Sequence, residues 1–96
     1  MLETVCEALV KGCCLEIYYE GRCIIGEVHA AGWDKAHNAA VLLFETADTA
    51  CEHVGEWRFI SLDDARNLDV SGYFSEAPRP DYQPSDRRFE RICCSV

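Results

Sequence analysis

Two apolar-rich segments joined by a two-residue turn decide the fold: Leu15-Glu16-Ile17-Tyr18-Tyr19-Glu20-Gly21-Arg22-Cys23-Ile24-Ile25-Gly26-Glu27-Val28-His29. Before the turn, Leu15, Ile17 and Tyr19 occupy alternate positions, which is the pattern of a half-buried strand. After the turn, the chain is rich in Ile and Val and reads as the returning strand. The sequence therefore predicts a β-hairpin, with Gly26 as the natural place for a bulge.

An amphipathic helix precedes this hairpin. Apolar residues recur at spacings of three and four, namely Leu2, Val5, Cys6, Leu9, Val10 and Cys13. Gly12 stands where a helix C-terminal cap is expected. We predict a helix over about residues 2–11 that covers one side of a small sheet, the alternative being a helix that docks a partner.

Further strands are expected downstream. The patterns predict strands over 39–45, 56–62 and 67–71, loops over 32–38 and 46–55, and one helical turn over 62–66. In the strand over 56–62, Trp57 and Phe59 share one side and Arg58 and Ile60 the other. We assign the more apolar side, with Trp57, to the core, and Arg58 to the solvent.

The chain changes character near its end. Residues 72–84 contain three prolines, which remove backbone donors, and predict an extended arm that wraps the domain. Ser85 offers a helix N-cap, and apolar residues then recur at helical spacing, at Phe89, Ile92, Cys93 and Val96. We predict a short C-terminal helix.

Residues 1–96 thus predict one domain of the α+β class, mainly β. A small, strongly bent antiparallel sheet with a leading helix and a short C-terminal helix fits an SH3/Sm-like half-barrel. A ferredoxin-like fold is the alternative. That fold needs a longer helix between strands than residues 33–38 offer.

Charge and cysteine usage narrow the classes of partner. The chain carries 9 Lys and Arg against 17 Asp and Glu, a formal charge of −8, which disfavours nucleic acid and anionic membranes. No apolar run reaches the ~20 residues of a membrane span, and no secretory signal is evident.

The odd count of 7 cysteines favours reduced thiols in a cytoplasmic protein, buried as small apolar side chains. Without any C-x-x-C pair, we expect no metal and no disulfide.

Motifs of catalysis and cofactor binding are absent, so we expect no cofactor. Cys23 and His29 could form a nucleophilic pair, but a small enzyme of this kind ranks last. A basic cluster, Arg79, Arg87, Arg88 and Arg91, is interleaved with Tyr82 and Phe89 and resembles a stacking surface for single strands. Nearby acidic residues neutralise it, so a salt-bridged, solvated face is the preferred interpretation.

Four segments taken together resemble the WYL domain, particularly its small stand-alone relatives. They are Leu15-Glu16-Ile17-Tyr18-Tyr19-Glu20-Gly21, Glu27-Val28-His29-Ala30-Ala31-Gly32, Trp57-Arg58-Phe59-Ile60-Ser61-Leu62-Asp63-Asp64-Ala65, and Pro78-Arg79-Pro80-Asp81-Tyr82 with Asp86 and Phe89. The resemblance covers roughly residues 5–96, with Val28 in place of the family's proline. It implies an SH3/Sm-like sheet and a sensing role, in which basic and aromatic residues bind nucleic acids or nucleotide-like ligands. Ile24 and Ser61 stand where the family usually carries arginines, which disfavours nucleic acid here.

We therefore expect a stand-alone, non-enzymatic regulatory or ligand-binding module of WYL type. Its candidate face carries Tyr19, Arg22, His29, Trp57 and Arg58. The aromatic rings would stack on a small anionic or nucleotide-like ligand, and the arginines would hold its anionic groups. The alternative is a protein-interaction domain, which docks a protein partner or forms a homodimer through an exposed sheet edge or the N-terminal helix.

Overall fold

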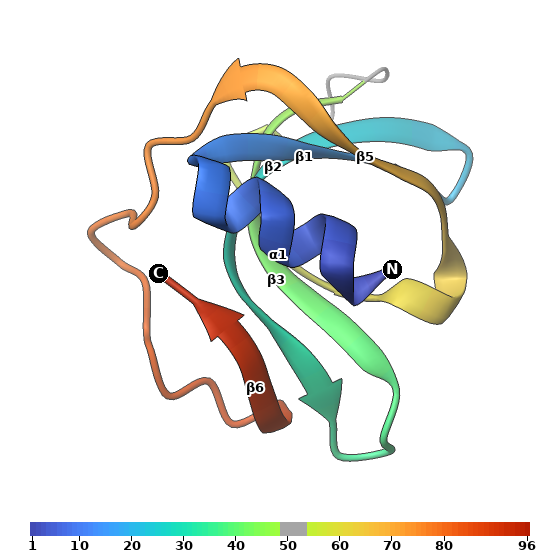
Figure 1. The fold of residues 1–96 in the computed structure, drawn as a ribbon, viewed down its shortest axis with the longest axis vertical. Helices are drawn as coiled ribbons and strands as arrows, with labels where there is room; N and C mark the ends of the chain where they lie inside the picture. The colour runs from blue at the N-terminus through green and yellow to red at the C-terminus, as the bar shows by residue number, and fades with distance from the viewer. Residues whose placement is uncertain (49–53) are drawn as a thin grey trace.

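The computed structural model describes residues 1–48 and 54–96, which form a mainly β protein with one N-terminal helix (Figure 1). In chain order the elements are α1 (Leu2–Lys11), β1 (Cys13–Tyr19), β2 (Arg22–Asp34), β3 (Ala39–Asp48), β4 (Trp57–Ser61), the 3-10 turn η1 (Leu62–Asp64), β5 (Ala65–Phe74) and β6 (Phe89–Ser95). The strands described form one antiparallel sheet in the order β4-β3-β2-β1-β5, and β6 pairs with β2. This sheet does not close on itself.

The predicted helix and hairpin are confirmed. Gly12 ends α1 in the left-handed conformation, with φ 69°, and its N–H bonds back to the last turn. Glu20 and Gly21 both have positive φ, as a two-residue turn that matches strand twist requires. Tyr19 stands opposite Arg22, and the pairing of β2 with β3 shifts register at Gly26, where a bulge was expected.

Strand β2 is longer than predicted and organises the molecule. The sequence predicts a loop from residue 32, but β2 continues to Asp34 because it pairs with β3 on one side and with β6 on the other. Gly32 permits the second pairing, since a Cβ there would lie 2.8 Å from Ile92 Cα and collide with the Arg91 backbone. Strand β3 likewise extends to Asp48, so the loop predicted over 46–55 starts later. Cys51 and His53 fall outside the described residues.

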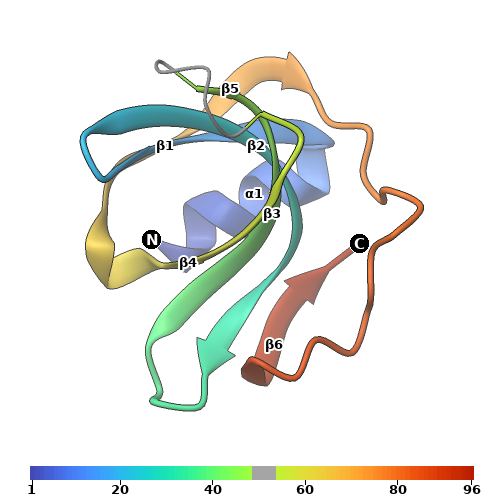
Figure 2. The same ribbon diagram turned by 180° about the vertical axis from the view of Figure 1, so that it is seen from behind.

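The predicted C-terminal helix is wrong, because residues 89–95 form β6. The spacing of Phe89, Ile92 and Cys93 suits a helix, but a helix this short is marginal unless tertiary contacts support it. The open edge of β2 offers backbone partners instead, and buried backbone groups must find partners. The arm also begins later than predicted, because β5 runs to Phe74. We call residues 75–88 the connecting arm; Figure 2 shows it passing from β5 to β6 along one side of the sheet.

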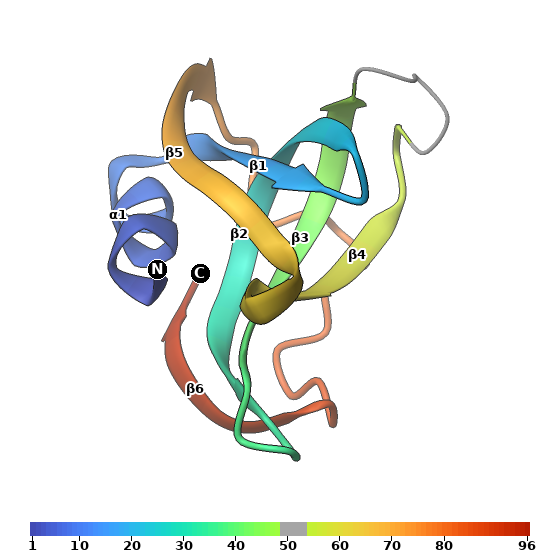
Figure 3. The ribbon, with the colours of Figure 1, turned by 90° about the vertical axis from the view of Figure 1, so that its right-hand side faces the viewer.

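Two apolar clusters cover opposite faces of the sheet. The main core lies under α1 and includes Val5, Ala8, Leu15, Ile17, Ile24, Val28, Ala31, Val41, Leu43, Ile60 and Leu62. The second cluster, Ala30, Ala40, Leu42 and Phe89, packs against Trp57, Phe59 and Tyr82. In Figure 3 the helix lies on one side of β2 and β3, and the connecting arm passes on the other. The prediction that Ile60 and Arg58 share the solvent side is therefore wrong, because Ile60 belongs to the main core.

A disulfide joins α1 to β6, with Cys6 and Cys94 at a Cα–Cα distance of 6.0 Å. The expectation that every thiol is reduced is wrong for this pair, because β6 brings Cys94 beside the helix, a juxtaposition that sequence spacing does not reveal. Within the described ranges, Cys13, Cys14 and Cys93 carry free thiols. No helix in those ranges has the length and apolarity to cross a membrane.

Candidate functional site

The structure divides the five predicted site residues between the two faces of the sheet. Tyr19 packs against the main core, and Arg22 stands directly opposite it at the hairpin, so the two share a face. His29 and Trp57 lie on the other face, where their rings meet at a centroid distance of 4.6 Å. The five side chains therefore do not line one pocket.

Arg58 is not directed to solvent as predicted. Its Nε donates to Oε1 of Glu45 at 3.1 Å, and the Glu45 side chain is fully buried on the core side of the sheet. A buried carboxylate needs such a partner, since an isolated charge in an apolar interior is strongly unfavourable. The sequence could not show this pairing, because Glu45 ends a segment that reads as an apolar strand.

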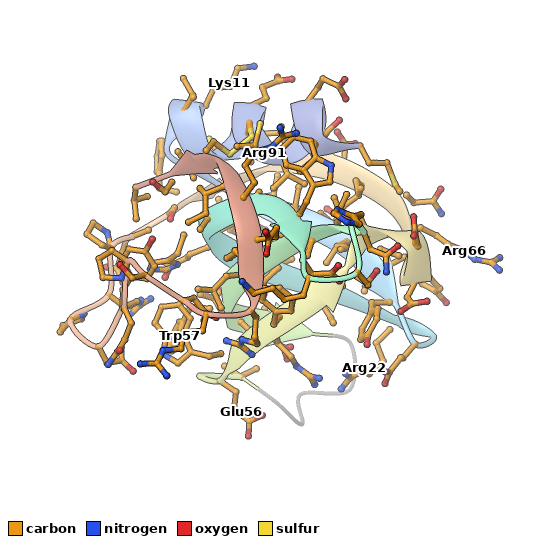
Figure 4. All side chains as sticks on the ribbon, turned by 90° about the horizontal axis from the view of Figure 1, so that it is seen from below. Lys11, Arg22, Glu56, Trp57, Arg66 and Arg91 are labelled. Atoms are coloured by element: carbon orange, nitrogen blue, oxygen red, sulfur yellow. A yellow bond between two sulfur atoms is a disulfide. The ribbon has the colours of Figure 1, made fainter. Side chains whose placement is uncertain are left out.

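His29 and Trp57 instead contact the connecting arm. The His29 ring lies 5.0 Å from that of Tyr82, and Trp57 Nε1 donates to Asp81 Oδ2 at 2.7 Å. The proposed catalytic pair of Cys23 and His29 is not assembled, because six positions along an extended strand separate the two by about 20 Å. Figure 4 shows Trp57 and Arg22 at well-separated positions on the molecule.

Glu27 and His29 together anchor the connecting arm to β2. Glu27 accepts from Arg79 Nε and from the Glu76 backbone N–H, both at 2.6 Å, so each carboxylate oxygen has a donor. His29 Nε2 accepts from the Arg79 backbone N–H at 3.0 Å. Its Nδ1 lies 3.0 Å from the Glu27 carbonyl oxygen and therefore carries the proton that it donates there.

This arrangement requires a neutral imidazole at position 29. Nε2 can accept the Arg79 N–H only while that nitrogen is unprotonated. Burial lowers the pKa of His29 below its ordinary value of 6.5, although the nearby Glu27 opposes this effect. The arm is thus held by a residue whose protonation breaks the bond that it makes.

An open cavity of about 530 Å³ lies beside this anchor. Its lining includes Cys14, Ile25, Glu27, Thr46, Ala47, Tyr73, Phe74, Glu76 and Arg79. Tyr73 and Phe74 are 63% and 86% exposed at the end of β5. The cavity therefore combines accessible aromatic rings with an arginine.

Arg79 is held in a fixed orientation at this cavity. Its guanidinium stacks on the Phe44 ring, with Cζ 4.6 Å from the centroid, while Nε bonds to Glu27. Nη2 lies 3.2 Å from an Oε2 of Glu76, whose side chain is 76% exposed. A planar guanidinium with most of its contacts already made is preorganised to bind one further anionic group.

Sequence reasoning missed Glu27, Tyr73 and Phe74 as candidate site residues, and assigned Arg79 to a basic cluster interpreted as a solvated face. One signal was available, because Glu27 and His29 are polar side chains two positions apart in an otherwise Ile- and Val-rich strand. Polar groups that share a buried face must be hydrogen-bonded, so their partners mark a packed segment. Nothing in the local sequence identifies Arg79 as that partner.

Residues 1–48 and 54–96 contain no group of three or more His, Cys, Asp or Glu side chains placed to hold a metal ion. In comparisons with known proteins, no family model, no curated protein and no solved structure matches this chain. The functional argument therefore rests on the geometry of the site.

Proposed function

We propose that the protein is a non-enzymatic ligand-binding module, and that its site is the cavity between the end of β5 and the connecting arm. The ligand is a small anion with an aromatic or apolar body. The observation that carries this proposal is the placement of Arg79 beside the exposed rings of Tyr73 and Phe74 on one cavity.

The anionic group of the ligand would bind at Arg79 Nη2. The Glu76 carboxylate already occupies that position, but on an exposed side chain, and exposed pairs of this kind contribute only about 0–1 kcal/mol. An external carboxylate or phosphate can therefore replace Glu76 at small cost. Glu27 remains on Nε and keeps the guanidinium in place.

The body of the ligand would rest on Tyr73 and Phe74. Exposed aromatic side chains at the rim of a cavity support a binding site there. Ligand pockets are typically lined by apolar and aromatic groups with a few polar ones. Ile25 and Ala47 continue the apolar wall inward. This is the ligand class expected from the sequence, held by different residues.

A WYL-type sensing role and an SH3/Sm-like architecture are part of the same proposal. The strand order β4-β3-β2-β1-β5, the leading helix and the 3-10 turn between β4 and β5 support that architecture. In this interpretation, the Glu27-Val28-His29 segment of the resemblance fixes the arm, and the arm supplies the arginine. The formal charge of −8 favours a small ligand over a nucleic acid.

The test is an NMR titration of the labelled protein with two matched pairs of probes. AMP and benzoate carry an anionic group, whereas adenosine and benzamide are their neutral counterparts. We expect the two anions to shift the backbone amides of Tyr73, Phe74, Glu76 and Arg79, and the neutral probes to bind more weakly. Phe74→Ala should weaken all four probes. If neither anion shifts these amides at millimolar concentration, the proposal is wrong.

A second candidate, protein interaction, is favoured by one observation. Strand β5 is at the edge of the sheet order and ends in Tyr73 and Phe74, and exposed sheet edges pair readily with other chains. A concentration-dependent mass in sedimentation, lost in Phe74→Ala, would support that function. A monomer at all concentrations would argue against a homodimer formed through β5.

A further inference from the structure

Three cysteines gather where α1 meets β6. Cys6 on the helix is bonded to Cys94 on the strand, and Cys93, the residue before Cys94, is free and exposed. A cavity of about 350 Å³ is lined by Leu2, Glu3, Cys6, Trp33 and Cys93. Cys93 and Cys6, one partner of the disulfide, therefore line the same cavity.

A bulge explains how neighbouring cysteines can both reach the helix side. Consecutive residues of a regular strand point to opposite faces, which would place Cys93 away from Cys6. In the pairing of β6 with β2, however, Cys94 stands opposite Ala31 and Ile92 stands opposite Gly32. Cys93 is therefore an extra residue of β6 with no β2 residue opposite it. An extra residue of this kind redirects its side chain.

We propose that Cys6, Cys93 and Cys94 form a thiol–disulfide exchange site, in which the Cys93 thiolate attacks Cys6 Sγ. The Cys93–Cys6 bond forms as the Cys6–Cys94 bond breaks, and Cys94 leaves as a thiolate. Cys93 loses its proton to solvent and Cys94 takes one up, so no oxidant or reductant is consumed.

Only one sulfur of the disulfide is a suitable target. Attack on Cys94 would join adjacent residues, whose Cα atoms are about 3.8 Å apart across a trans peptide, closer than the roughly 4.4–6.8 Å that disulfides span. Attack on Cys6 instead moves the link between α1 and β6 by one residue. The helix stays attached to the strand in both forms.

The test maps the disulfide in the native, oxidised protein. The protein is held at about pH 8.5, near the ordinary thiol pKa, and then acidified and alkylated with N-ethylmaleimide. Trypsin cleaves after Lys11 and Arg91, which places Cys6 in the peptide 1–11 and both other cysteines in 92–96. Fragmentation between Cys93 and Cys94 then shows which of the two is linked.

We expect both linkages in the wild-type protein, reached at a rate that rises with pH because the thiolate is the attacking species. Cys93→Ser should show only the Cys6–Cys94 link, and folded Cys94→Ser, supplied with oxidised glutathione as the oxidant, should form Cys6–Cys93. Cys13→Ser is the matched control and should behave like the wild type. If the wild-type protein at about pH 8.5 contains only the Cys6–Cys94 link, the proposal is overturned, whatever the variants do.

Discussion

Glu27 and Arg79 are 52 residues apart in sequence and form an ion pair in which Arg79 Nε lies 2.6 Å from Glu27 Oε1. The Glu27 side chain is 2% exposed, whereas that of Arg79 is 27% exposed. The pair therefore joins the interior of β2 to the connecting arm. It also sets the guanidinium at the wall of the cavity.

Removal of Arg79 should destabilise the fold, because it leaves the Glu27 carboxylate buried without its ionic partner. We expect Arg79→Ala to lower the free energy of unfolding by about 3 kcal/mol, at the low end for a broken buried pair because the open cavity admits water. Denaturant unfolding measures this loss.

Arg87→Ala is the matched control, since Arg87 is an exposed arginine on the same arm. Its effect should stay within about 0.5 kcal/mol. Equal losses in the two variants would show that the Glu27–Arg79 pair does not hold the arm.

Local patterns in the sequence were enough to predict the helix, the hairpin and the turn after β4, because each rests on residues close together in the chain. The end of the chain was mispredicted for a physical reason. Phe89, Ile92 and Cys93 have helical spacing, but the edge of β2 beside Gly32 decides their conformation. The candidate site depends on the same long-range contacts. The sequence therefore suggested arginine and aromatic chemistry, but it did not place Arg79 beside Tyr73 and Phe74.

The sequence pattern assigns Arg58 to the solvent, and its pairing with Glu45 reverses that prediction. Arg58→Ala should cost about 3–5 kcal/mol, because fully buried Glu45 loses its ion pair. The exposed arginine variant Arg66→Ala should cost no more than about 0.5 kcal/mol. The double variant Arg58→Met with Glu45→Leu should recover much of the loss, since apolar replacement of a buried pair is often neutral. If chemical denaturation shows that the double variant is as unstable as Arg58→Ala, the result would argue against the pairing of Arg58 with Glu45.

Stability should fall on mild acidification because of His29. Burial lowers the pKa of this imidazole in the folded protein, so below about pH 6.5 the unfolded chain binds a proton more readily than the folded one. Its stabilising contribution is complete above that pH and is lost as the pH falls toward the folded-state pKa. Denaturant unfolding curves recorded between about pH 4 and 7 should show the free energy of unfolding of the wild type rising with pH.

His29→Gln should lose that slope, whereas His37→Asn should keep it, because His37 is exposed in a turn. Asn suits the positive φ of 65° at position 37, so this control carries little strain. An unchanged slope in His29→Gln would refute the role given to His29.

Gly32→Ala should detach β6, because the added Cβ would collide with the Arg91 and Ile92 backbone rather than with a movable side chain. Hydrogen exchange at the amides of β6 should accelerate markedly. Gly72→Ala is the control, since nothing lies within 4 Å of a Cβ at that position and its exchange should match the wild type. Slow exchange in both variants would contradict the close approach of β6 to β2.

The most direct test of the ligand-binding account is the affinity of benzoate and benzamide for Glu76→Gln. This exposed substitution removes the carboxylate that competes for Arg79 Nη2 and leaves the Glu27 anchor intact. The account predicts that benzoate binds about two- to fivefold more tightly than to the wild type, matching the loss of an exposed ion pair, while benzamide is unchanged. Unchanged or weaker binding of benzoate would contradict the account.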